Sequence, residues 1–450
     1  MKMTNRFLIV AVGAVALSSC ATFKGKKKTP VLGQRISILA GENDVRADKT
    51  IAGVEVLVPP TAPNDSWAQP GGNAAKSIGN LTLGANVSRA WSATIDGGSK
   101  RQRLGAAPVV ADGRLYAIDV NATVHAFSAT NGASVWTTNI ATSDKKSQSA
   151  RFGGGVSFDD GKVFATDGLG DVVALDAATG KVAWRAKPGA PLRGAPTVAN
   201  GEVYILSQDN QLYALSQADG SVQWTQSGSI ETQGVFGVAA PAVSQGTVVA
   251  GFSSGELNAY RYENGRTLWQ DALSRSTIST SVSSLADIDA DPVIDRGIVF
   301  AVGQGGRMVA LEIVSGQRLW EQNFAGISTP WVAGEWVFIV TDDARLVCLA
   351  RATGKVRWIS QLRRYKSEKT KKDGTIKDSK KSNPVTWYGP VLAGGRLVLT
   401  NSEGQIASAS VDTGKVTSVI DAKTAFTLPP IVANSTLYVL DQKGHITAYK

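Results

Sequence analysis

The sequence predicts an all-β fold: an eight-bladed β-propeller of four-stranded antiparallel blades whose ring is closed by an N-terminal strand. Three observations support this prediction. A Gly-x-x-x-Trp spacing occurs six times, with 38 to 51 residues between successive Trp residues. Short runs rich in Val, Ile, Leu and Tyr alternate with Gly, Asn, Asp and Thr-Gly turns, which is typical of strands. A further Trp-bearing strand precedes the first complete copy. Strand-built repeats with a period in the forties are characteristic of propeller blades.

The repeating unit is clearest in its second and third copies. The second copy contains Ala174–Trp184, and the third copy contains Gln211–Leu215 and ends at Gly220–Trp224. Each unit holds four short antiparallel strands. A turn ending in Gly joins the third strand to the fourth, because glycine tolerates the positive φ that such hairpins need.

The number of copies is eight, and two of them are incomplete. The seventh copy keeps Gly414 but has Ser418 where the Trp is expected, and the eighth ends at Lys450 without a fourth strand. The segment Ser88–Ile95 carries Trp91 and has no three strands before it, so we expect it to complete the eighth blade. Closure of the ring would remove free sheet edges. We assign residues 67–450 to the propeller.

The repeated tryptophans are expected to be structural. An indole ring packed on the glycine of the next blade would fix the spacing between blades, and loss of one such ring would cost roughly 3–5 kcal/mol. The tryptophans in question are Trp91, Trp136, Trp184, Trp224, Trp269, Trp320 and Trp358.

The N-terminus predicts export and a lipid anchor. Residues 1–19 combine basic Lys2 and Arg6 with an apolar run that is too short for a stable membrane span. The tetrapeptide that ends at Cys20 resembles a bacterial lipobox, in which the cysteine receives acyl chains such as palmitate. The alternative is an ordinary secretory signal with an incidental cysteine. Residues 20–66 are expected to be a lipid-anchored tether, possessing a short added strand at most.

The residue after Cys20 indicates the destination. It is Ala21, not the Asp that resembles an inner-membrane retention signal. We therefore expect a lipid-anchored protein on the periplasmic face of the outer membrane, which contacts the membrane through its anchor.

The net charge of +10 is concentrated in two segments. Four lysines lie between residues 24 and 28, beside the anchor, where they favour contact with anionic headgroups. A basic insertion at 363–381 contains nine basic and three acidic residues. It is either a solvated loop or a binding arm. The rest of the chain is nearly neutral, so we expect no nucleic-acid partner.

The sequence lacks the residues that catalysis or metal binding would need. It has two histidines and two cysteines, without the spacing of a nucleophilic triad, a metal site or a haem attachment. Cys348 lies in an apolar strand and is expected to be a buried thiol. We therefore predict a non-enzymatic protein with no cofactor and no metal.

One carboxylate cluster occurs, at Asp287-Ile-Asp289-Ala-Asp291. It begins like a calcium loop, but Pro292 and Ile298 occupy the positions of the turn glycine and the bidentate glutamate, so calcium binding is excluded. Two interpretations stay open from the residues alone. The acids lie on a solvated loop edge, or they are exposed acids that meet the basic side chains of a partner.

The repeat core resembles that of the pyrroloquinoline-quinone dehydrogenase propellers, best at Ala174-Leu-Asp-Ala-Ala-Thr-Gly180-Lys-Val-Ala-Trp184. This resemblance covers the ring and implies architecture, not activity. With the lipobox, the single ring and the segment 284–293, the chain is similar to the propeller lipoproteins of the outer-membrane β-barrel assembly machinery.

This second resemblance implies a scaffold that aids the folding and insertion of β-barrel proteins. Asp287 and Asp289 match two acids that, in that family, contact a periplasmic domain of the central barrel subunit. The family's Leu-Arg-Gly step is Val235-Phe236-Gly237 here, so Val235 and Phe236 would give an apolar contact without an arginine. Nascent outer-membrane proteins would be further partners, through the exposed edges of outer strands.

Two other functions are compatible with a propeller. A quinone-dependent dehydrogenase would need an axial cofactor pocket, a metal-binding set of acids and an electron acceptor. A carbohydrate-binding periplasmic propeller would bind glycans and would not associate with barrel-assembly proteins.

Overall fold

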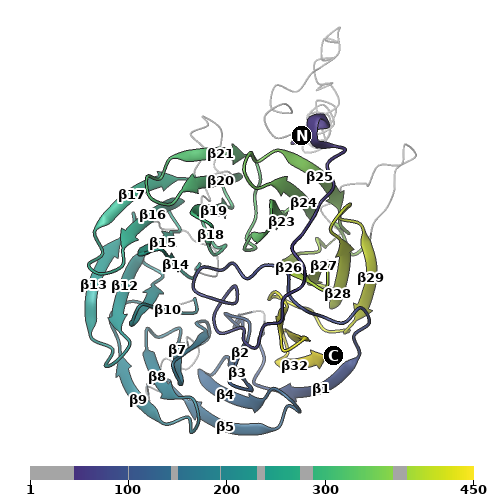
Figure 1. The fold of residues 1–450 in the computed structure, drawn as a ribbon. Helices are drawn as coiled ribbons and strands as arrows, with labels where there is room; N and C mark the ends of the chain where they lie inside the picture. The colour runs from purple at the N-terminus through teal and green to yellow at the C-terminus, as the bar shows by residue number, and fades with distance from the viewer. Residues whose placement is uncertain are drawn as a thin grey trace, which may run out of the picture. The chain divides into compact units, whose positions relative to one another are not determined.

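A computed structural model describes residues 45–99, 101–142, 151–192, 194–230, 239–273, 287–367 and 383–450. Within these residues the chain forms eight four-stranded antiparallel sheets arranged in a ring, which confirms the predicted eight-bladed propeller (Figure 1). The helical content of the described part is small; η2 (Lys49–Ile51) is a single 3₁₀ turn.

Each blade runs from an inner strand near the axis to an outer strand at the perimeter. Blades one to four contain β2 (Val109–Ala111), β3 (Arg114–Ile118), β4 (Thr123–Ser128), β5 (Ser134–Asn139), β6 (Val156–Asp159), β7 (Lys162–Thr166), β8 (Val172–Asp176), β9 (Val182–Ala186), β10 (Thr197–Ala199), β11 (Glu202–Leu206), β12 (Gln211–Ser216), β13 (Val222–Ser227), β14 (Ala242–Ser244), β15 (Thr247–Gly251), β16 (Glu256–Arg261) and β17 (Thr267–Ala272).

Blades five to eight continue the same order. They contain β18 (Val293–Asp295), β19 (Ile298–Gly303), β20 (Arg307–Glu312), β21 (Arg318–Gln322), β22 (Trp331–Ala333), β23 (Trp336–Val340), β24 (Arg345–Ala350), β25 (Val356–Gln361), β26 (Trp387–Ala393), β27 (Arg396–Asn401), β28 (Gln405–Ser410), β29 (Val416–Asp421), β30 (Ile431–Ala433), β31 (Thr436–Leu440) and β32 (His445–Tyr449). The central strands are almost fully buried, because each sheet packs on its two neighbours.

The eighth blade is completed from the other end of the chain, as predicted. Strand β1 (Arg89–Thr94) pairs antiparallel with β32, with Trp91 opposite Ala448. Two backbone hydrogen bonds between Ser88 and Lys450, each of 2.9 Å, extend this pairing to the last residue. The two ends of the ring are thus joined by a complete strand pair.

Neighbouring blades are joined by the repeated tryptophans. In seven of the eight junctions within the described ring, the indole N–H of an outer-strand Trp donates to a backbone carbonyl of the next blade, at 2.7–3.1 Å. The donor and acceptor pairs are Trp91–Ala129, Trp136–Ala177, Trp184–Gln217, Trp224–Tyr262, Trp269–Ile313, Trp320–Arg351 and Trp358–Val411. Each of these tryptophans therefore links its own blade to the next one through a hydrogen bond.

The glycine of each Gly-x-x-x-Trp spacing receives the ring of the preceding blade. At Gly265, φ is 70° and a Cβ atom would lie 2.6 Å from the ring of Trp224. A side chain at this position is excluded both by the left-handed backbone and by the indole. The repeated spacing thus links two blades, because its Trp contacts the next blade and its Gly receives the ring of the previous one.

The junction between blades seven and eight has neither partner of this contact. Ser418, at the position of the missing Trp on β29, is exposed, and Val416 and Val419 beside it are 41 % and 49 % exposed. In blade eight, no turn joins the third strand to the fourth. Ser88, just before β1, and Lys450, just after β32, lie where the other blades have a glycine turn.

The segment before β1 crosses the centre of the ring in Figure 1 and contacts the inner strand of every blade in turn. Most of these contacts involve the middle residue of the inner strand. The hydrogen-bonded pairs, in chain order, are Asn64–Val432, Trp67–Val110, Ala68–Phe158, Gln69–Val198, Ala74–Val243, Ala75–Ile294, Gly79–Trp331 and Leu81–Leu392. This segment therefore supplies partners to backbone groups on the inner edges of the sheets, which would otherwise face the axis unpaired.

The described part of the expected tether also lies on the ring. The N–H of Asp48 donates to the carbonyl of Val356 at 2.8 Å, Arg357 donates to the carbonyl of Val54, and Val56 is buried. Residues 45–66 are thus packed against the blades, in contrast to the tether that we expected over 20–66. Residues 1–44, which include the expected signal peptide, lie outside the described residues.

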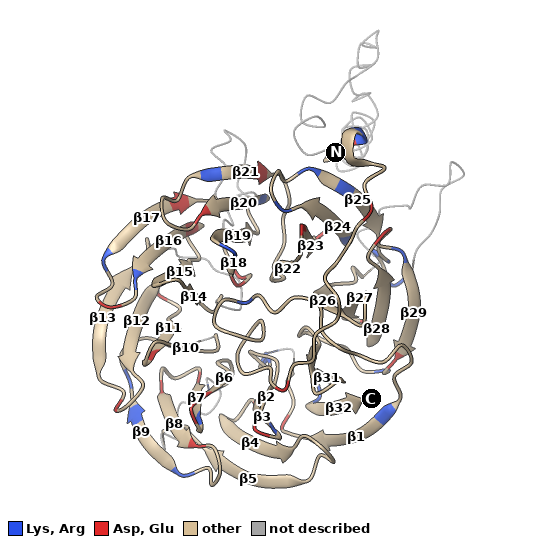
Figure 2. Ribbon diagram, viewed as in Figure 1, with Lys and Arg blue, Asp and Glu red and all other residues tan. Residues whose placement is uncertain are grey.

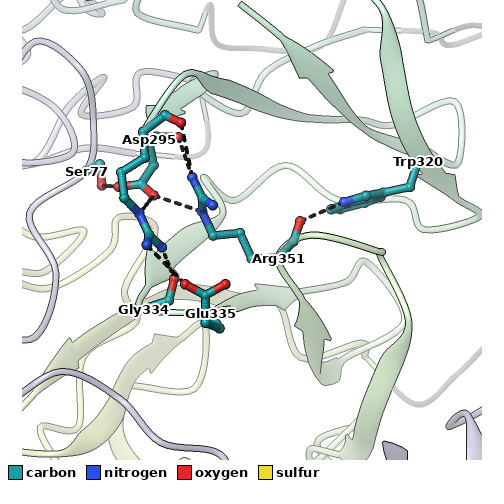
Figure 3. A network of polar contacts seen from close by, with 7 residues as sticks. Ser77, Asp295, Trp320, Gly334, Glu335 and Arg351 are labelled. Atoms are coloured by element: carbon teal, nitrogen blue, oxygen red, sulfur yellow. Dashed lines mark hydrogen bonds and ion pairs between the residues drawn. The ribbon is translucent and has the colours of Figure 1, made fainter. Parts of the chain in front are cut away.

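A polar network ties this segment to the blade junctions (Figure 3). Ser77 donates to Asp295 at 2.9 Å, and Asp295 accepts from Arg351 at 3.0 Å. The carbonyl of Arg351 in turn accepts the indole N–H of Trp320 at 2.8 Å. The network therefore connects the central segment, blade five, blade six and one Trp junction.

We expect Trp224→Ala to lower the free energy of unfolding by about 3–5 kcal/mol, because it removes a buried ring and its hydrogen bond from one junction. Urea denaturation followed by circular dichroism measures the change. The matched control is Ser418→Ala, at the equivalent position of blade seven, which should change stability by less than about 0.5 kcal/mol. Equal effects of the two substitutions would contradict the role of the junctions.

Candidate functional site

The two faces of the ring differ. One face carries the turns between the first and second strands of each blade and those between the third and fourth strands, and we call it the turn face. The segment before β1 lies on this face, with hydrogen bonds to the turn residue Asn434 and to Asp295 at the end of β18. We call loop face the opposite face, which carries the turns between second and third strands and the connections between blades. The candidate site lies on the loop face.

The predicted acids precede β18 and are held between three blades. The carbonyl of Asp287 accepts from the N–H of Gln304 at 2.9 Å in blade five. Ile288 packs against Gly251 of blade four. Asp291 accepts from the N–H of Ala240 at 2.7 Å, and its own N–H donates to Thr329 of blade six at 3.2 Å.

The expected exposure of these acids is therefore wrong. Asp287 is only 3 % exposed, and both carboxylate oxygens of Asp289 are buried. The segment is not an open loop edge, because loops of neighbouring blades enclose it on both sides.

Asp289 carries a frustrated charge. Neither of its carboxylate oxygens has a hydrogen-bond partner within the described residues. Burial, and then the nearby carboxylates of Asp287 and Asp342, raise its pKa to about 7. Burial and the neighbouring Asp343 also raise the pKa of Asp342, to about 6. We refer to Asp287, Asp289 and Asp342 as the acid cluster.

The acid cluster favours a positively charged ligand group. Like charges in a buried place oppose one another, and an opposite charge nearby would restore the ionised form of Asp289. In the part of the chain that the structure describes, no group of three or more His, Cys, Asp or Glu side chains is arranged to hold a metal ion. Independently of that finding, a basic side chain would supply the positive charge that favours the ionised form of Asp289.

Asp291 has a different role from its two neighbours in sequence. Its carboxylate accepts a hydrogen bond from Ala240 and lies near Lys76 of the central segment. Burial lowers the pKa of Lys76 to about 8, whereas the Asp291 carboxylate opposes this shift. The Lys76 ammonium donates to Thr197 at 2.9 Å. This pair holds the central segment to the blades and is structural.

Lys76 and Asp342 were missed from the sequence. Neither lies in a motif, and each joins the site through a long-range contact between distant parts of the chain. The other predicted contact residues, Val235 and Phe236, lie outside the described residues, and so does Cys20.

The remaining predictions concern single segments. Cys348 is fully buried, and burial raises the pKa of its thiol, as expected for a structural cysteine. Of the basic insertion, the structure describes 363–367, where Lys366 lies 3.1 Å from Glu403. Elsewhere on the ring, acidic and basic residues are interspersed (Figure 2). None of the helices in the described ranges is long and apolar enough to cross a membrane.

A family profile described as outer membrane protein assembly factor BamB matches residues 120–360. The BamB of Yersinia pestis is 27 % identical over 255 residues, which cover 56 % of this chain and 60 % of that protein. The BamB of Escherichia coli K12 is 29 % identical over 305 residues, which cover 58 % of this chain and 72 % of that protein. This chain thus matches less than two thirds of the length of the Yersinia relative.

Solved structures share the fold. The crystal structure of BamB from Moraxella catarrhalis has a TM-score of 0.68 at 18 % identity, and covers 81 % of this chain and 100 % of that chain. A quinohemoprotein alcohol dehydrogenase from Comamonas testosteroni has a TM-score of 0.63 at 14 % identity, and covers 89 % and 83 %. At these identities the likeness concerns the propeller architecture alone.

We expect Asp289→Asn to stabilise the protein in a pH-dependent way. Because the folded state holds the proton of Asp289 up to about pH 7, the stability cost of this carboxyl grows from about pH 4 to pH 7 and is complete above pH 7. The amide should therefore raise the free energy of unfolding at pH 8 by up to about 4 kcal/mol.

At pH 3.5, where the carboxyl is protonated in both the folded and the unfolded state, the same variant should be close to neutral. Urea unfolding at both pH values measures this difference. Asp412→Asn, at an exposed turn, is the control. If the difference in the free energy of unfolding between the variant and wild type is the same at both pH values, the ionised Asp289 carboxylate does not destabilise the folded protein.

Proposed function

The chain belongs to the family of outer membrane protein assembly factor BamB, and on that premise we propose that it is a non-catalytic scaffold subunit of the machinery that assembles outer-membrane proteins. In this role it aids the folding and insertion of β-barrel proteins. Its partner is the central barrel subunit of that machinery, which it contacts through the subunit's periplasmic domain.

The observation that carries this proposal is the acid cluster. Asp289 has two buried carboxylate oxygens without a hydrogen-bond partner in the described ranges, next to two further acids. Such an arrangement lowers the stability of the free protein, and a basic partner group would relieve it. Asp287 and Asp289 would bind that group, and Val235 and Phe236 would add an apolar contact.

A scaffold role also agrees with the positions of the repeat elements. The tryptophans and glycines that dominate the sequence pattern are used in the junctions between blades. The central segment occupies the turn-face side of the axis. The feature left over from these structural roles is the acid cluster on the loop face, which suits contact with a partner. The similarity to dehydrogenases is one of fold.

Nascent outer-membrane proteins would contact the perimeter. Several outer strands carry an exposed aliphatic side chain one or two residues before their Trp, such as Val135, Val222 and Leu268. The outer strand is the last in each sheet, so its edge is unpaired by other strands within the described blades. Extended client segments could pair there.

The experiment that tests the partner contact is co-purification from membranes in mild detergent. Wild type should recover the central barrel subunit. The double variant Asp287→Arg/Asp289→Arg should weaken recovery by about 30-fold or more, because it places positive charge against a basic surface.

The matched control is Asp65→Arg/Asp412→Arg, which reverses two exposed acids on the turn face and should leave recovery unchanged. Circular dichroism must show that all variants are folded. Equal recovery by wild type and the loop-face variant would place the interface elsewhere, and no recovery by wild type would overturn the assembly role.

We further propose that Cys20 carries the lipid anchor that holds the protein on the periplasmic face of the outer membrane. Cys20→Ala should therefore shift the protein from the membrane fraction to the soluble fraction, and should remove the mass of the acyl chains. Cys348→Ala, at the other cysteine of the sequence, should leave the fractionation unchanged. Membrane retention of the Cys20→Ala protein would refute the anchor.

A further inference from the structure

A cavity of about 280 Å³ lies on the axis of the ring. Its floor is the central segment, which contributes Trp67, Pro70 and Lys76. Its wall is formed by the segments that lead into the inner strands, including Ile327, Thr427 and Leu428. Because the central segment covers the turn face, the cavity belongs to the loop face.

The lining of the cavity is mainly apolar. Trp67 and Trp331 stack on one another at its floor, with ring centroids 6.0 Å apart. The polar groups at the floor are already paired, since Lys76 donates to Thr197 and lies near Asp291. An occupant of this cavity would therefore gain free energy mostly by burying apolar surface.

The cavity is continuous with the acid cluster. Asp289 belongs to both, because it lines the cavity and lies beside the carboxylates of Asp287 and Asp342. The segment 287–291 thus forms one wall of the cavity, whereas Thr427 and Leu428 form a wall that belongs to the connection between blades seven and eight. An apolar hollow and an uncompensated negative charge therefore adjoin on one face.

We propose that the axial cavity receives an apolar side chain of the partner, carried on a loop whose neighbouring basic residue meets the acid cluster. This inference rests on the proposed function, which it deepens: the interface extends from Asp287 and Asp289 to the axis of the ring. The occupant is a loop of the barrel subunit's periplasmic domain. Its volume is limited to a few side chains, because pockets for drug-sized ligands begin at about 300 Å³.

The test fills the cavity from the connection between blades seven and eight, which is distant in sequence from the acids and carries no charge at Thr427. Thr427→Trp should weaken the binding of the purified central barrel subunit by the full-length protein at least about tenfold, because a buried anchor side chain loses its place. The matched control is Thr424→Trp, the same enlargement in the same connection at a residue that does not line the cavity; its Kd should stay within about twofold of wild type. Isothermal titration in mild detergent measures both.

A second variant guards against misfolding. Ile327→Phe fills the cavity from blade six, and should weaken binding in the same direction as Thr427→Trp while retaining the urea midpoint of wild type. Loss of binding in both cavity variants, with the control unchanged, supports the inference.

Three results would overturn it. Folded cavity variants that bind like wild type, while Asp287→Arg/Asp289→Arg does not bind, would refute the axial contact and leave the proposed function intact. A small molecule that native mass spectrometry finds in wild type but not in Thr427→Trp would assign the cavity to that molecule. Failure of wild type to bind the barrel subunit would refute both proposals.

Discussion

The contact between an indole ring and the glycine of the next blade is the interaction on which the ring depends. Each sheet is short, so a single blade buries too little apolar surface to be stable alone. The indole N–H fixes the ring to a carbonyl of the next blade, for example Trp224 to Tyr262 at 2.7 Å, and the glycine allows the close approach. The hydrogen bond fixes the orientation of the indole ring, and the packing of the ring on the glycine fixes the distance between the sheets. The contact therefore sets the spacing of the blades and also holds them together.

The axis presents a second constraint. Eight inner strands leave eight edges of backbone N–H and C=O groups around a narrow channel, where unpaired groups would be costly. The segment before β1 supplies the missing partners. Its contacts follow the order of the blades, from Asn64, which contacts β30, to Leu81, which contacts β26. Its presence on the turn face leaves the loop face as the side on which the axis remains hollow and accessible to a partner.

The sequence predicted the ring but not its centre. The Gly-x-x-x-Trp spacing, the substitution at Ser418 and the isolated strand with Trp91 defined the blades, their number and the closure. The central segment could not be found in the same way, because its contacts are mainly backbone hydrogen bonds and leave no side-chain pattern. Asp287 and Asp289 were selected by resemblance, but their burial and the third acid, Asp342, come from neighbouring blades that no local pattern reveals.

The departures from good packing identify where the molecule interacts. In the junctions, local sequence, hydrogen bonding and packing all favour the same structure. On the loop face they conflict, since Asp289 is buried beside like charges and the adjoining axial space is unfilled. A chain selected only for stability would replace such a carboxylate by an amide and fill such a space, because both changes are single substitutions. Their coincidence on one face is therefore more simply explained by a partner that supplies a positive charge and an apolar side chain than by two independent defects.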